Sequence, residues 1–274
     1  MARVRRVAHQ DELTLTEHLG ELRSRLVLCV TVLLVVGGVA FWQWEKILRW
    51  TTKPANHAVD VYNQNHNTSL EHLQFLQTSP TGAFFAAFSL SMDVAILVTL
   101  PLLTYQIYAF VLPAFAPEHH TRIRWLALLV PMLFLVGVAF AWILVLPPAL
   151  DFLLNFGGDQ FNVQLTATEY LQFITMLMLA MGVIFEMPAV MYTLAKMRIV
   201  SARMMRKTWR YAVVLLAVVA GVLPGADPVS FVFEFVPLLV LYGFSYLLVK
   251  MVDRNREADE ASSRWEDGGG WESV

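Results

Sequence analysis

The residues best suited to chemistry are charged groups that stand beside long apolar runs. Glu21 and Arg23 belong to the sequence EHLGELRSRL at residues 17–26, directly before an apolar run. A carboxylate held next to an arginine at a membrane surface can receive a cationic peptide through charge-assisted hydrogen bonds. A simpler interpretation is that these charges only orient the first membrane helix. Other features of the sequence are needed to choose between the two interpretations.

A second candidate is the carboxyl of Glu186, which lies inside an apolar run in the sequence FEMP. A charged side chain in the middle of a membrane helix costs about 2.5–3.5 kcal/mol on insertion scales, so it should face the bundle interior or water. Pro188 cannot donate a backbone hydrogen bond and leaves the carbonyl of Ile184 free, which opens a polar notch beside the carboxyl. The alternative is a hydrogen-bonded glutamate with a structural role.

Three more acidic residues fall in or next to apolar runs. Asp93 lies within the second run, and Glu234 is surrounded by phenylalanine and valine, which disfavours an unpaired position facing lipid. Asp227 directly precedes Pro228, and an aspartate at this place can cap the helix that follows. For Asp227 the sequence leaves capping and a functional role equally open.

Catalytic and metal-binding patterns are lacking. The chain has no GxSxG nucleophile motif and no phosphate-binding P-loop. His119 and His120 are adjacent and therefore point to different sides, which makes a metal site unlikely by geometry, and a single cysteine, Cys29, allows no intramolecular disulfide. We expect no enzyme, no cofactor, no metal and no nucleic-acid partner.

The elements that position these residues are long apolar helices. The chain has 274 residues, of which 57% are hydrophobic and only 15% charged, and its mean hydropathy is +0.55. Because roughly 20 apolar helical residues cross a bilayer, the sequence predicts an all-α membrane protein with six transmembrane helices. The predicted spans are residues 26–44, 84–111, 125–146, 169–195, 211–223 and 229–249. They form one domain, residues 1–250, followed by a charged, glycine-rich tail, residues 251–274, that we expect to be disordered.

The distribution of basic residues predicts the orientation. With a cytoplasmic N-terminus, 17 of the 20 Lys and Arg residues fall in cytoplasmic segments. Only Lys46, Arg49 and Lys53 lie on the other side. This asymmetry satisfies the positive-inside rule at every loop and predicts that both termini are cytoplasmic.

Taken in order, these segments resemble the TatC family, the multispanning receptor subunit of the twin-arginine protein translocase. The similarity covers roughly residues 15 to 250. The chain departs from the family pattern at His119, where the family has a glutamate and this chain has Glu118 one residue earlier. It departs also at Phe231, Gly82 and Glu234. The positions that carry the resemblance are residues 18–26 (HLGELRSRL), Pro54, residues 79–80 and 84–85, Pro101, Tyr105, Gln106, Phe110, residues 185–188 including Pro188, Asp227, Ser230 and Pro237.

The resemblance implies a receptor for signal peptides that bear two consecutive arginines. Guanidinium pairs bidentately with carboxylate where lysine cannot, so Glu21 and Glu118 are the expected binding groups at the cytoplasmic face. Arg23, His119 and Phe110 would surround them. The apolar part of the peptide would lie along a concave helical bundle, with Glu186 as a polar point.

The resemblance further implies partners and a location. Small single-span Tat subunits, folded precursor proteins and the lipid bilayer are the expected partners, in an oligomeric complex in the cytoplasmic membrane of a prokaryote. Pro54, Pro101 and Pro188 would be structural.

A different class of function stays open from the residues alone. An ion-coupled transporter of small solutes could use Asp93, Glu186 and Glu234 as a proton path. An intramembrane hydrolase is disfavoured because the sequence offers no nucleophile and base pair.

Overall fold

The structure, a computed structural model, describes residues 15–66, 75, 80–111, 120–156, 166–225 and 227–268. Helices make up nearly all of this part of the chain, as the sequence predicts. In order they are α1 (Leu15–Trp42), α2 (Trp44–Thr51), α3 (Lys53–His66), α4 (Gly82–Val111), α5 (His120–Phe140), the π-helix η3 (Ala141–Val145), α6 (Leu146–Asn155), α7 (Ala167–Phe185), α8 (Met187–Lys196), α9 (Ala202–Val222) and α10 (Pro228–Gly268).

Five segments of the described chain are long and apolar enough to cross a membrane, which makes this a multi-pass membrane protein. They are Leu22–Trp42, Gly82–Ala109, Leu129–Asn155, Ala167–Lys196 and Pro228–Arg256. The predicted span at residues 211–223 corresponds to the second half of α9, whose first half carries four basic residues. Because α9 is not among the five, the number of six spans stays a prediction.

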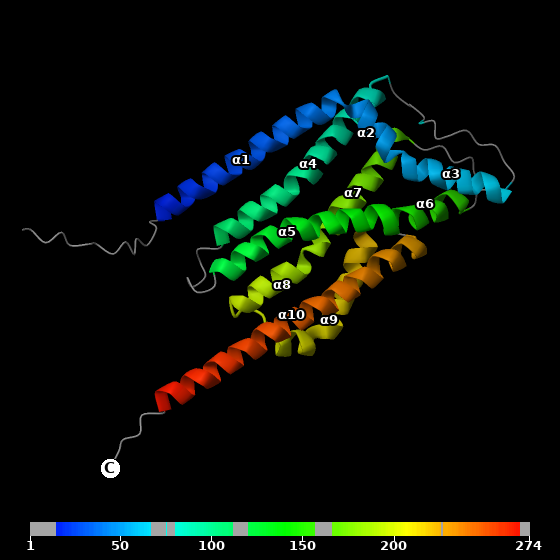
Figure 1. Ribbon diagram of the computed structural model, residues 1–274. Helices are drawn as coiled ribbons and strands as arrows, with labels where there is room; N and C mark the ends of the chain where they lie inside the picture. Colours follow the sequence, from blue (N-terminus) through cyan, green and yellow to red (C-terminus); the bar gives the residue numbers. More distant parts are fainter. Residues whose placement is uncertain are drawn as a thin grey trace, which may run out of the picture.

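The helices form one bundle with two distinct ends (Figure 1). α1 packs along α4, α5 packs between α4 and α7, and α8 and α9 both pack on α10. The beginning of α1, the end of α4, the α8–α9 turn and the later part of α10 lie toward one end, which we call the basic end. α2, α3 and α6 lie toward the opposite end, which we call the far end.

Two glycines allow α5 and α7 to approach closely. A Cβ atom on Gly137 would lie 2.5 Å from the Met181 carbonyl oxygen, and one on Gly182 would lie 2.6 Å from the Phe134 ring. Small residues at helix contacts let backbones approach in membranes, where packing is a main force between helices. This contact fixes the last turns of α7, directly before Glu186.

The third predicted span is longer than expected. The sequence predicts a stop at Pro147-Pro148, but helix continues through η3 and α6 to Asn155. Leu146 donates its backbone N–H to the Ala141 carbonyl, five residues back, in the wide π-turn. The two prolines then occupy the first turn of α6, where their missing N–H groups cost little.

The predicted disordered tail is another correction. Helix α10 runs without interruption to Gly268, through most of residues 251–274. Val249 and Val252 pack against Ala195 and Met205, so the helix is anchored near the end of its apolar span Pro228–Arg256, directly before the charged segment. Arginine, glutamate and alanine, which are good helix formers, are frequent in the segment that follows. Local propensity and this anchoring outweigh the high charge on which the prediction rested.

Candidate functional site

The predicted binding residues at the basic end are only partly described. Arg23 is exposed on α1. Glu21 lies on the same helix and Phe110 on α4, but both side chains are outside the described part of the structure. Glu118 and His119 lie outside the described residues altogether. The site therefore has to be built from the side chains around them.

A hydrogen bond between Arg25 and Gln106 joins two of the motif segments. One guanidinium nitrogen of Arg25, Nη1, donates to Oε1 of Gln106 at 2.6 Å, linking α1 to α4. Residues four apart share a helix face, so Glu21 stands one turn before this contact on the same side of α1. The contact holds the helix of Glu21 against the helix that leads toward Glu118. Sequence reasoning used Arg25 and Gln106 only as motif positions.

Glu186 lies at a break between two helices, whereas the sequence predicted one span over residues 169–195 with a polar notch at Pro188. It forms the junction between α7 and α8, and its side chain is buried, with 7% exposed. The Glu186 carbonyl accepts hydrogen bonds from the backbone N–H groups of Ala189 and Val190, both at 3.0 Å. The carboxyl is therefore held at a fixed point in the membrane part of the bundle.

Hydroxyl groups gather around this carboxyl. The Thr104 hydroxyl donates to the Pro101 carbonyl at 3.0 Å and lies close to the Glu186 carboxyl, whose Oε1 is buried without a hydrogen-bond partner among the described residues. Tyr108, one turn further along α4, contacts Thr193 of α8 and is close to Glu186. We call Thr104, Tyr108, Glu186 and Thr193 the hydroxyl cluster. Sequence reasoning missed its hydroxyl residues, although Thr104 and Tyr108 have the four-residue spacing of one helix face.

Asp93 forms a separate, half-buried polar point between α4 and α7. Its carboxyl oxygen Oδ2 accepts a hydrogen bond of 3.0 Å from the Thr175 hydroxyl, which also lies 2.8 Å from the Leu171 carbonyl. A groove of about 240 Å³, lined also by Gln172 and Leu179, opens beside it. Asp93 is therefore hydrogen-bonded across two helices and is not part of the hydroxyl cluster.

Asp227, directly before α10, and Glu234, inside α10, differ from each other. Oδ1 of Asp227 accepts hydrogen bonds from the backbone N–H groups of Val229 at 3.0 Å and Ser230 at 2.8 Å, so Asp227 caps the helix. Glu234 is fully buried, and neither of its carboxyl oxygens has a hydrogen-bond partner among the described residues.

The arrangement gives no support to a proton path through three carboxyls. In the described part of the chain Asp93 accepts a hydrogen bond from Thr175, and Glu186 lies near Thr104. No hydrogen bond that we find there joins either of them to Glu234.

Of the proposed structural prolines, Pro188 begins α8 and is buried, Pro101 lies inside α4, and Pro54 lies in the first turn of α3. Two of the three thus sit at helix starts, where proline is well tolerated. Pro101 instead leaves a backbone carbonyl of α4 without its helical donor, one turn from the hydroxyl cluster.

Comparison with known proteins relates this arrangement to one family. The family model described as Sec-independent protein translocase protein (TatC) matches residues 17–237. The protein of that name from Helicobacter pylori (strain ATCC 700392 / 26695) is 31% identical over 239 residues, which cover 87% of this chain and 88% of the relative. The one from Aquifex aeolicus (strain VF5) is 31% identical over 247 residues, covering 89% and 97%.

Solved structures agree with the sequence relatives. A crystal structure of the twin-arginine translocase receptor TatC superposes with a TM-score of 0.71 at 28% identity, covering 86% of this chain and all of that one. A second structure of the receptor, in the detergent DDM, gives a TM-score of 0.70 at 30% identity and covers 85% of this chain. The family consists of translocase components and is not a family of enzymes. The matched segment includes the Arg25–Gln106 contact and all four residues of the hydroxyl cluster, and the chain belongs to the TatC family.

Proposed function

We propose that this protein is the signal-peptide receptor and core component of a twin-arginine translocase, which exports folded proteins across a prokaryotic cytoplasmic membrane. The observation that supports it most directly is the Arg25–Gln106 contact, because it ties the charged start of α1 to the end of α4. A two-arginine peptide needs carboxylates at one end of the bundle, and this contact brings together the helices that carry or lead to them.

Two carboxylates would bind the arginine pair. Glu21 lies on α1 one turn before Arg25, and Glu118 follows α4 in the chain. Each guanidinium can form two parallel hydrogen bonds with a carboxylate, whereas a lysine ammonium offers only a point charge. Arg23, exposed on α1, would balance the charge of Glu21 when no peptide is bound. His119 and Phe110 would complete the surroundings of the peptide.

The apolar part of the signal peptide would follow the bundle from the basic end toward the hydroxyl cluster. Glu186 and Thr104 are buried polar side chains in the otherwise apolar part of the bundle that the peptide would approach. A peptide backbone entering the membrane has polar groups that require partners, so a fixed polar point along the path lowers the cost of entry.

The proposal includes a topology and partners. We propose six spans, with α9 as the fifth, and both termini in the cytoplasm, because the basic residues concentrate at one end of the bundle. Small single-span Tat subunits would bind the same complex, which we expect to be oligomeric. Co-purification of such subunits with the full chain from native membranes checks this part independently of the peptide site.

Peptide crosslinking tests the site. A photoreactive peptide with two arginines should crosslink to the full chain in membranes, and Glu21→Ala should reduce the yield about tenfold or more, because a charge-assisted contact contributes about 1.5–3 kcal/mol. Glu118→Ala should reduce it less. A peptide with two lysines should crosslink weakly to the unchanged protein.

The matched control is Glu169→Ala, which removes an exposed carboxylate from the first turn of α7, at the far end. This variant should crosslink like the unchanged protein. If Glu21→Ala and Glu118→Ala both leave the yield unchanged, the assignment of the arginine site is wrong.

A further inference from the structure

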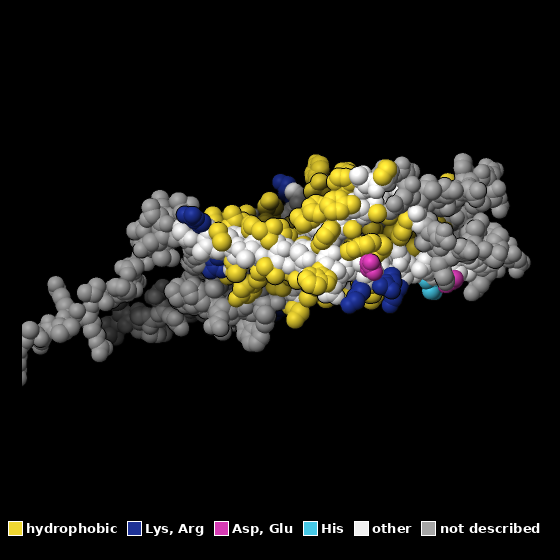
Figure 2. Space-filling view, turned by 90° about the horizontal axis from the view of Figure 1, so that it is seen from above, with side chains coloured by type: hydrophobic (Ala, Val, Ile, Leu, Met, Phe, Trp, Pro, Cys, Tyr) yellow, Lys and Arg dark blue, Asp and Glu magenta, His cyan; other side chains and the backbone are white. Residues whose placement is uncertain are grey.

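The far end carries an exposed surface that the receptor function does not use. α2 is a short amphipathic helix that begins two residues after the apolar span Leu22–Trp42 ends. Only three basic residues of the chain, Lys46, Arg49 and Lys53, are predicted on this side of the membrane. Lys46 and Arg49 both lie on α2. Figure 2 shows Lys and Arg side chains gathered with an acidic one beside the apolar surface, toward the end that holds α2 and α3.

A groove runs along this surface from apolar to charged residues. Its volume is about 510 Å³, and its lining includes Val39 and Trp42 from α1 together with Trp44, Lys46 and Arg49 from α2. Trp42 is 89% exposed at the end of the span, a position where tryptophan commonly marks the boundary between hydrocarbon and headgroups. One side of the groove thus fits an acyl chain, and the other fits an anion.

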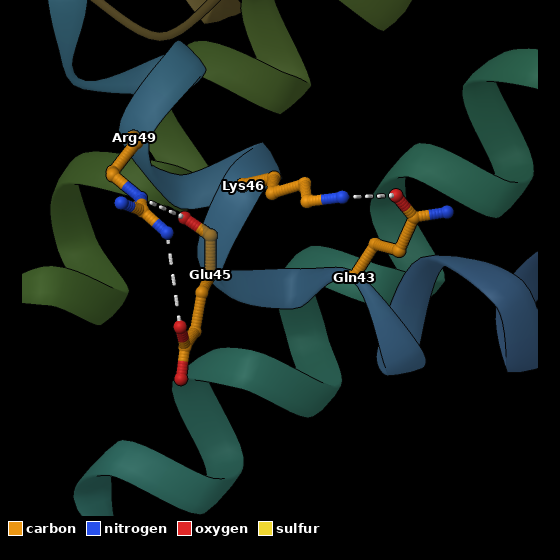
Figure 3. A network of polar contacts seen from close by, with 4 residues as sticks. All are labelled: Gln43, Glu45, Lys46 and Arg49. Atoms are coloured by element: carbon orange, nitrogen blue, oxygen red, sulfur yellow. Dashed lines mark hydrogen bonds and ion pairs between the residues drawn. The ribbon is translucent and has the colours of Figure 1, made fainter.

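The cations of the groove are weakly engaged within the protein (Figure 3). The Lys46 ammonium lies 3.4 Å from the Gln43 side-chain oxygen. The Arg49 guanidinium lies 3.8 Å from the Glu45 carboxylate and donates from Nε to the Glu45 backbone carbonyl at 3.3 Å, and these two side chains are 75% and 68% exposed. Exposed pairs of this kind contribute little, so both cations can turn to an external anion at small cost.

The backbone beneath these cations is held firmly. Trp50 of α2 stacks on Trp142 of η3, with ring centroids 4.0 Å apart and an interplanar angle of 1°. The Tyr170 hydroxyl donates to the Thr51 carbonyl at 2.8 Å, and Ile47 and Leu48 pack against the core. A surface fixed in this way loses little conformational entropy when it binds a ligand.

We propose that the groove between α1 and α2 is a binding site for an anionic phospholipid. Lys46 and Arg49 contact the phosphodiester, and the acyl chains follow Val39 and Trp42 toward the span. A soluble anion fits less well, because half of the groove is apolar and continuous with the membrane surface of α1. The positive-inside rule predicts few basic residues at the far end. A lipid-binding site there would explain why Lys46 and Arg49 are present.

Lipid binding to the purified full chain tests the proposal. Native mass spectrometry would measure affinity for phosphatidylglycerol and for phosphatidylcholine with the same acyl chains. Each basic side chain near an anionic lipid is worth about fivefold in affinity. The double variant Lys46→Gln/Arg49→Gln should therefore bind phosphatidylglycerol about 30-fold more weakly and phosphatidylcholine equally well.

Two further variants make the test specific. Glu45→Gln removes the acidic neighbour of Arg49, so it should bind phosphatidylglycerol more tightly than the unchanged protein does. Lys250→Gln/Arg254→Gln removes two exposed basic groups from α10, toward the other end, and should change the affinity less than threefold, since it alters net charge but not the groove.

Three outcomes would overturn the proposal. They are an unchanged phosphatidylglycerol affinity in the Lys46→Gln/Arg49→Gln variant, an equal loss in the α10 control, and displacement of the lipid by millimolar inorganic phosphate, which would indicate a site for free anions. All the altered side chains are exposed, so the variants should fold like the unchanged protein. The expected rise in phosphatidylglycerol affinity for Glu45→Gln, opposite to the expected fall for Lys46→Gln/Arg49→Gln, gives a second readout. None of these results depends on binding of a signal peptide.

Discussion

Glu186 and Glu234 are the same chemical group in two membrane helices of one bundle, yet their surroundings differ. Glu186 lies at the break between α7 and α8, beside Thr104 and close to Tyr108. Glu234 lies inside the continuous helix α10, fully buried, and without a hydrogen-bond partner among the described residues. A helix break supplies polar groups that a continuous helix does not.

The difference indicates two kinds of intramembrane carboxyl. One lies at the junction of two helices with the Thr104 and Tyr108 hydroxyls nearby, although its Oε1 has no hydrogen-bond partner among the described residues. The other is held only by the packing of the helix that carries it, and burying an unpaired polar group costs free energy. We therefore expect Glu186 to matter for transport and Glu234 to matter for stability.

The largest effect should come from Glu186→Leu. Loss of the polar point should lower export of a twin-arginine reporter about tenfold or more, since hydrogen bonds to charged groups contribute about 1.5–3 kcal/mol. Glu186→Gln, which keeps a polar atom at the same place, should retain more activity than Glu186→Leu. Export rates in cells measure this, with membrane levels of the protein as the control. If Glu186→Leu exports the reporter as well as the unchanged protein does, Glu186 is not needed for transport.

The same type of substitution at Glu234 should have the opposite effect and stabilise the protein. Glu234→Leu replaces an unpartnered buried carboxyl with an apolar side chain of similar size, so the free energy of unfolding should rise by about 1–3 kcal/mol. Export should stay within about twofold of the unchanged protein, because the residue is remote from the proposed peptide path. Unfolding of the purified protein in detergent measures the first quantity. A loss of stability in Glu234→Leu would mean that this carboxyl has a partner of its own.

A smaller effect is expected when the neighbour of Glu186 is changed. Thr104→Val removes a hydroxyl that lies near the Glu186 carboxyl and donates to the Pro101 carbonyl, so export should fall by no more than about fivefold, in line with a net hydrogen-bond contribution near 1 kcal/mol. A double-mutant cycle with Glu186→Leu measures the coupling. If the two effects simply add, the hydroxyl does not act through Glu186.

Some structural features could be predicted because they depend on neighbours in the chain. Asp227 precedes a helix start, so its capping role is one that local sequence suggests, and Pro188 lacks the backbone N–H that a continuous helix would need at its position. Pro147-Pro148 misled the prediction, because a π-turn beforehand lets the helix pass through them. The tail prediction failed for a related reason: the packing of Val249 and Val252 against α8 and α9 cannot be read from charge alone.

The candidate site was predictable in its carboxylates and not in their partners. Glu186 is conspicuous as a charge in an apolar run, whereas Thr104 and Tyr108 are ordinary residues of a helix until α7 and α8 are placed beside them. In the same way Arg25 and Gln106 are far apart in the chain, and only the packing of α1 on α4 brings them to 2.6 Å.

The sequence by itself determined the class of multi-pass membrane protein, the asymmetry of basic residues and the family, because hydropathy and motifs are properties of the chain read in order. Only the tertiary structure decided which polar groups meet. It brought Thr104 to Glu186, left Glu234 without a partner in the described chain, and fixed α2 through Trp142 and Tyr170. The physical reason is that hydrogen bonds and ring stacking act over a few ångströms, and which atoms come that close depends on how the helices pack.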